Sequence, residues 1–170
     1  LAHGQAYASI HILEAAGDSS EKARAIIAQA HAFKAGVDKD ALIQRVDELK
    51  AFLDKHKGAD ITAIFKAVAE LDWKLSDQQR TSLGQAINAY KSLARDSGDQ
   101  KLARRYNFHL GALYLWRGQV AIRDFAKSAV DLVESAVAAE FQNLGDLDAG
   151  PLLANGTQAL QDLFWAFVHM

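Results

Sequence analysis

The sequence contains no cysteine. This absence excludes disulfide bonds, thiol catalysis, iron–sulfur clusters, thiolate zinc sites and covalently attached c-type haem. Proline is almost absent as well, because Pro151 is the only one among 170 residues. Such a composition, rich in apolar residues, suits long helices and suits neither β-sandwiches nor linkers. A membrane-spanning helix needs about 20 apolar residues. No apolar run in the sequence approaches that length, so we expect no membrane span.

The sequence also lacks an excess of positive charge. Its formal net charge is -2, whereas domains that bind DNA or RNA are normally strongly basic. We therefore expect no nucleic-acid partner. The absence of cysteine is compatible with an oxidising or a reducing compartment, and the chain begins at Leu1 rather than at a methionine. Localisation thus stays open, with an exported protein favoured over a cytoplasmic one.

Apolar residues recur at helical spacing along nearly the whole chain, and glycines interrupt this pattern. The pattern predicts one all-α domain over residues 1–170, with about eight helices in antiparallel hairpins, either repeat-like or an irregular helical bundle. A loop is expected over residues 145–150, followed by a last helix that begins at Pro151. The glycines predicted to end helices are Gly17, Gly36, Gly58 and Gly118.

Short polar side chains predict where several helices begin, because they accept hydrogen bonds from the first free amides. Asp18 with Glu21, and Ser76 with Gln79, have the spacing of a capping box. Asp38 and Asp60 are the other expected caps. In the helix after Asp38, one apolar stripe is predicted to face the core, opposite the face that carries Arg45. The stripe consists of Leu42, Val46, Leu49 and Leu53.

Two similar segments lie 35 residues apart in the second half of the chain. The residues Gly-Gln-Ala-Ile-Asn-Ala-Tyr at 84–90 correspond to Gln-Val-Ala-Ile-Arg-Asp-Phe at 119–125. Leu110-Gly111 lies between them, followed by Gly118 at a predicted hairpin turn. Over about residues 82–129 this pattern resembles a tetratricopeptide repeat, a unit of stacked helical hairpins. The resemblance implies an adaptor or scaffold that binds a protein or peptide.

The helix predicted from Gln100 to Arg117 carries apolar residues on two faces, which is typical of a central helix or of one that lines a binding surface. If the resemblance holds, a peptide would lie against the first helix of each hairpin. The residues of this helix that would face the peptide are Arg105, Phe108, Ala112 and Leu115.

A second resemblance involves the segment Ala30-His31-Ala32-Phe33-Lys34-Ala35-Gly36. It is similar to the phosphorylation motif of histidine phosphotransfer domains, which are four-helix bundles. The resemblance implies that an exposed His31 accepts a phosphoryl group and that Lys34, on the same helix face, neutralises it. The alternative is a solvated histidine near a helix end.

The last predicted helix is too apolar to be left in water, so it should pack on the core or against another subunit. A homo-oligomer through Phe164, Trp165 and Phe167 is one of these two outcomes.

No motif in the sequence indicates catalysis. Metal sites in helical bundles use Glu-x-x-His pairs or histidines one turn apart, and neither spacing occurs. A phosphate-binding loop, a nucleophile elbow and a dinucleotide fingerprint are also missing. We therefore predict a non-catalytic protein- or peptide-binding module without metal or cofactor. The alternatives are a helical bundle that senses or carries a small ligand, and the phosphotransfer domain.

Overall fold

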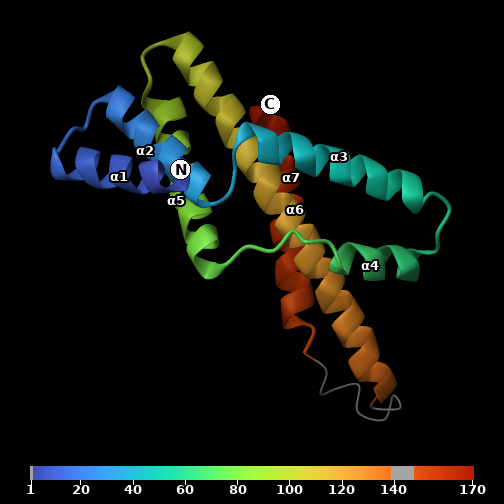
Figure 1. The fold of residues 1–170 in the computed structure, drawn as a ribbon. Coiled ribbons are helices and arrows are strands. Elements are labelled where there is room, and N and C mark those ends of the chain that lie inside the picture. The colour runs from blue at the N-terminus through green and yellow to red at the C-terminus, as the bar shows by residue number, and fades with distance from the viewer. Residues whose placement is uncertain (1, 139–147) are drawn as a thin grey trace.

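The computed structural model describes residues 2–138 and 148–170 (Figure 1). These residues form seven α-helices and no strand. The all-α prediction is confirmed, but the described chain has seven helices instead of about eight. The first part of the loop predicted over residues 145–150 lies outside the described residues. The helices are α1 (Ala2–Ala15), α2 (Glu21–Lys34), α3 (Lys39–Lys55), α4 (Ile61–Ala69), α5 (Asp77–Asp96), α6 (Gln100–Ala138) and α7 (Gly150–His169).

Most of the predicted helix ends are confirmed. Gly17, Gly36 and Gly58 follow the first three helices, with φ angles of 63°, 80° and 84° that favour glycine. The side chains of the predicted caps Asp38 and Asp60 accept backbone hydrogen bonds, and Ser76 with Gln79 forms a complete capping box. The cap of α2 is an exception.

The cap of α2 is Ser20 rather than Asp18. The Ser20 hydroxyl accepts a hydrogen bond from the Ala23 amide at 3.1 Å. The Asp18 carboxylate instead accepts one from the Ser20 amide at 2.9 Å. Asp18 therefore orders the turn before the helix, and the prediction that it caps the helix directly is wrong by two residues.

The main apolar core lies where α2, α5 and α6 meet. α5 is central, since it packs against α2 on one side and α6 on the other. Leu83 and Leu93 from α5 are almost fully buried, as is Leu110 from α6. Small side chains of α2, including Ala28 and Ala32, let the helices approach closely. This arrangement fixes α2 and α6 on either side of α5.

Gly118 does not end a helix. α6 runs without interruption from Gln100 to Ala138, and Gly118 is buried inside it. A Cβ atom at this position would lie 3.2 Å from the Cβ of Asp162 on α7. The glycine therefore permits a close approach between two helices, and the predicted turn is wrong. Without that turn, the described residues give no evidence of a tetratricopeptide hairpin there.

α7 runs antiparallel along α6 (Figure 1). Midway along the pair, the Arg117 guanidinium donates two hydrogen bonds to the fully buried Asp162 carboxylate, at 2.9 and 2.6 Å. Pro151 lies in the first turn of α7, as predicted. Among the described helices, none is long and apolar enough to cross a membrane.

The predicted inward stripe of α3 is only partly buried. Leu42 packs against the main core, whereas Val46 and Leu53 are 52% and 61% exposed. Arg45, predicted to face solvent, is instead buried, with its guanidinium carbon 3.9 Å from the ring centre of Trp116 and 5.3 Å from that of Trp73. A cation between two aromatic rings thus helps to hold α3 in place, together with the core contact of Leu42 at the start of the stripe.

Candidate groove between helices α2 and α6

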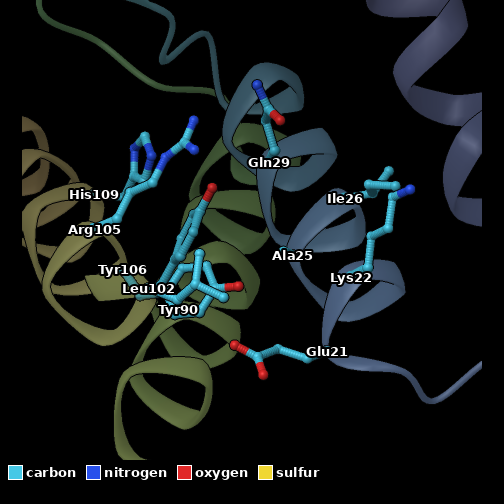
Figure 2. Close-up of a pocket in the computed structure, with 10 residues that line it drawn as sticks. All are labelled: Glu21, Lys22, Ala25, Ile26, Gln29, Tyr90, Leu102, Arg105, Tyr106 and His109. Atoms are coloured by element: carbon cyan, nitrogen blue, oxygen red, sulfur yellow. The ribbon is translucent and has the colours of Figure 1, made fainter. Parts of the chain in front are cut away.

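A groove runs between α2 and α6, with α5 as its floor. It consists of two cavities of about 490 and 530 Å³. Gln29 from α2, Tyr90 from α5 and His109 from α6 line both cavities, so the two are continuous. Figure 2 shows the first cavity, with Gln29 on one wall, Arg105 and His109 on the other, and Tyr90 between them.

The floor of the groove is an aromatic pair. The rings of Tyr90 and His109 are stacked, with centroids 5.1 Å apart and an interplanar angle of 25°. Tyr90 is buried, whereas His109 is half-buried. Because α5 packs against both neighbouring helices, it fixes the Tyr90 ring at the centre of the groove.

Burial keeps both rings of this pair uncharged near neutral pH. Desolvation raises the pKa of Tyr90 to about 12. Desolvation, with a smaller contribution from the positive charge of Arg105, lowers the pKa of His109. The floor is therefore a neutral aromatic surface, and the formal charges of the groove lie on its walls.

The two walls meet at one end through hydrogen bonds to Glu21. The Ser97 hydroxyl donates to the Glu21 carboxylate at 2.8 Å. Burial and a hydrogen bond to the same carboxylate raise the pKa of Tyr106 on α6. In Figure 2 the Tyr106 hydroxyl points toward Glu21. These contacts close the groove beside the start of α2, while Arg105 stays exposed above it.

The other end of the groove is more apolar. Phe33 from α2 and Phe108 from α6 both line the second cavity, together with Ala112 and the first turns of α3. The Phe108 side chain is 58% exposed. A large aromatic ring left in water at the edge of a cavity is available to a binding partner.

Three of the four predicted peptide-contacting residues lie in this groove. Arg105 lines the first cavity, and Phe108 and Ala112 line the second. Leu115 lines neither cavity and packs instead against the main core, so it lies outside this groove. Leu115 lies seven residues beyond Phe108 and therefore on a similar face of α6, so helical periodicity alone does not separate it from the groove residues.

The sequence prediction missed the wall formed by α2. Gln29 and Phe33 lie four residues apart and therefore share a helix face, but this spacing is common in amphipathic helices. It indicates a groove only once α2 is known to lie opposite α6.

His31 does not have the exposure that phosphotransfer requires. Only 8% of the residue is exposed, and its Nδ1 atom is buried without a hydrogen-bond partner. Burial and the positive charge of Lys34 lower the pKa of His31. A phosphoryl donor must reach a ring nitrogen in line, so this placement does not favour His31 and Lys34 as a phosphoacceptor pair.

Within residues 2–138 and 148–170, the ionisable side chains form no group of three or more that could hold a metal ion. Comparisons of the chain with family models, curated proteins and solved structures find no match. The case for a function therefore depends on the groove itself.

Proposed function

We propose that the chain is a non-catalytic binding module that holds a short helical segment of a partner protein between α2 and α6. The observation that carries the proposal is the continuity of the two cavities over the stacked Tyr90 and His109 rings. A stacked pair offers a flat surface for side chains to pack on, without the hydrogen bond that an acid–base couple would need.

The shape of the groove favours a helix as its occupant. α2, α5 and α6 form three sides of a bundle whose fourth side is open, and a fourth helix would complete the packing. From Glu21 to Phe33 the groove is about 18 Å long at 1.5 Å per residue, the length of about 12 helical residues. Such a segment would place apolar residues at i, i+3 or i+4, and i+7 over the aromatic floor.

The charges on the walls favour an acidic residue in that segment. Arg105 is exposed on the α6 side, directly beside the neutral floor. A carboxylate can bind an exposed guanidinium in bidentate fashion. We therefore expect an amphipathic helix with at least one Asp or Glu at the end nearer Arg105.

A small-ligand carrier is the second candidate. Each cavity has the volume of a small-molecule site, which is about 300 to 1,000 Å³. Such sites enclose most of their ligand. This groove does not, because Gln29 on one wall and Phe108 on the other are both exposed. The openness favours a peptide.

A peptide selection tests the proposal. A displayed library of helix-forming peptides of about 12 residues is selected against the wild-type chain, and the affinity of the binders is measured by fluorescence anisotropy. Phe108→Glu should weaken binding at least tenfold, which is about 1.4 kcal/mol. Arg105→Glu should weaken binding of acidic peptides, and replacing the peptide's carboxylate with lysine should restore it.

Two control variants make the selection specific. Val46→Glu, on the exposed face of α3 outside the groove, should leave the affinity unchanged. Leu115→Glu should destabilise the fold, because Leu115 packs on the core, whereas Phe108→Glu should not. Peptides that bind Phe108→Glu as well as wild type, or a library without any binder, would contradict the proposal.

A further inference from the structure

A second apolar surface lies on another part of the molecule, between α4, α6 and α7. It contains two cavities of about 590 and 440 Å³ that both include Phe65 of α4. Val130 and Val133 of α6 line the first, and Leu160 and Leu163 of α7 line the second. We call this continuous surface the α4–α6 trough.

Beside the trough, the outer face of α7 forms an apolar ridge. Leu153, Leu160, Phe164 and Phe167 recur at spacings of seven, four and three residues, so they lie on one stripe of the helix. Their exposed fractions are 68%, 72%, 60% and 83%. The opposite face of α7, with Ala159, Asp162 and Ala166, is buried against α6. The ridge therefore has no partner within the described chain.

The predicted contact residue Trp165 lies off this ridge. Its ring stacks near Tyr114 and His169, with centroids 6.4 and 5.8 Å away. Phe164 and Phe167, at 60% and 83%, are thus more exposed than Trp165, at 43%.

α7 carries almost no charged side chains, so its outer face suits neither water nor a lipid surface. Asp162 and His169 are its only ionisable side chains. Asp162 is buried with Arg117, and His169 lies within 2.9 Å of the Asn107 amide oxygen. Helices that bind membrane surfaces carry lysine or arginine beside their apolar face, and α7 has neither. A protein surface is the occupant that this chemistry favours.

We infer that the ridge and the trough bind a second copy of this chain. The two features lie side by side, and Leu160 belongs to both. A two-fold axis near Leu160 would therefore bring each ridge onto the apolar surface of the other copy. The heptad-like spacing of the ridge is that of helices which pack against one another.

The area of the surface is sufficient for a stable dimer. Their exposed fractions imply that the ridge residues, with Ile61, Val133 and Val137 at the edge of the trough, present on the order of 900 Å² per copy to a partner. Two copies would bury on the order of 1,800 Å², which is within the range of specific protein–protein interfaces. The inference is independent of the α2–α6 groove, which uses different residues.

Light scattering during size-exclusion chromatography tests this inference. The wild-type chain should have twice its 18.5 kDa mass. Phe164→Glu and Phe167→Glu should each shift the particle to monomer mass without loss of helical circular dichroism, because both side chains are exposed. The control Val46→Glu, at an apolar residue of α3 that is 52% exposed, should remain a dimer.

Cross-linking locates the axis, since the natural chain has no cysteine. Leu160→Cys should form an intermolecular disulfide under mild oxidation, whereas Val46→Cys should not. A wild-type monomer at about 100 μM, a dimer that survives Phe164→Glu and Phe167→Glu, or a dimer that Leu160→Cys cannot cross-link would each overturn the inference. Binding of the monomer to anionic vesicles or to a different protein through this face would also overturn it.

Discussion

Substitutions at two helical glycines test the packing of α7 on α6. Gly118 in α6 and Gly84 in α5 both lie inside helices, and alanine is favoured over glycine there by about 1 kcal/mol. A Cβ at Gly84 would meet no atom within 4 Å, whereas one at Gly118 would lie 3.2 Å from the Asp162 Cβ and 3.5 Å from a Leu163 methyl carbon. The two alanine variants therefore share one helix propensity and differ in one interhelical contact.

We expect Gly84→Ala to raise the free energy of unfolding by about 1 kcal/mol. Gly118→Ala gains the same propensity but forces α7 outward by a few tenths of an ångström, and overpacking of this kind costs about 1 to 3 kcal/mol. The two variants should therefore differ by about 2 kcal/mol. Gly118→Leu, whose side chain has no space at all, should weaken the α6–α7 contact further.

Urea denaturation followed by circular dichroism measures these differences, and hydrogen exchange shows where they act. Gly118→Ala should increase amide exchange along α7, while Gly84→Ala should leave it unchanged. If Gly118→Ala stabilises the chain as much as Gly84→Ala does, α7 does not pack closely at Gly118.

Three further perturbations test other contacts. Asp162→Asn should lower the free energy of unfolding by about 3 kcal/mol, the lower end of the range for breaking a buried ion pair. The lower end applies because the Arg117 side chain is 35% exposed. Urea denaturation measures the loss. Arg45→Ala should remove the cation between two tryptophan rings and lower the free energy of unfolding by about 2 kcal/mol. It should also raise amide hydrogen exchange in α3. Unchanged exchange would show that the Trp116 contact does not hold the helix. Burial lowers the pKa of His31 in the folded chain, so the unfolded chain binds the proton more readily. Stability should therefore be complete above about pH 6.5 and fall as the pH drops toward the folded pKa, by at most about 1.4 kcal/mol per pH unit for this residue. His31→Gln should flatten that dependence in denaturation curves measured from pH 7.5 to 5, and an unchanged slope would exclude His31 as its source.

Part of the candidate groove could be predicted from sequence because it lies on one helix. Arg105, Phe108 and Ala112 share a face of α6 whatever that helix packs against, since helical periodicity alone brings them together. Gln29 and Phe33 on the other wall have equally regular spacing. Nothing local to α2 indicates that this face lies opposite α6, so half of the groove depends on tertiary packing.

The sequence by itself determined the features that depend on neighbouring residues. Gly17, Gly36 and Gly58 end helices because the chain there adopts a positive φ, and Ser76 with Gln79 begins one through its own hydrogen bonds. These interactions span a few residues, so the local pattern is sufficient to predict them.

Only the tertiary structure decided what Gly118 and Arg45 do. Glycine can end a helix or permit a close contact, and the choice at Gly118 depends on α7, which is distant in sequence. Arg45 is buried because two tryptophans from other segments surround its guanidinium, and Val46 and Leu53 of the apolar stripe are left in solvent. Hydrophobic periodicity shows that a helix has two faces, but the partner that covers a face is set by contacts between segments far apart in the chain.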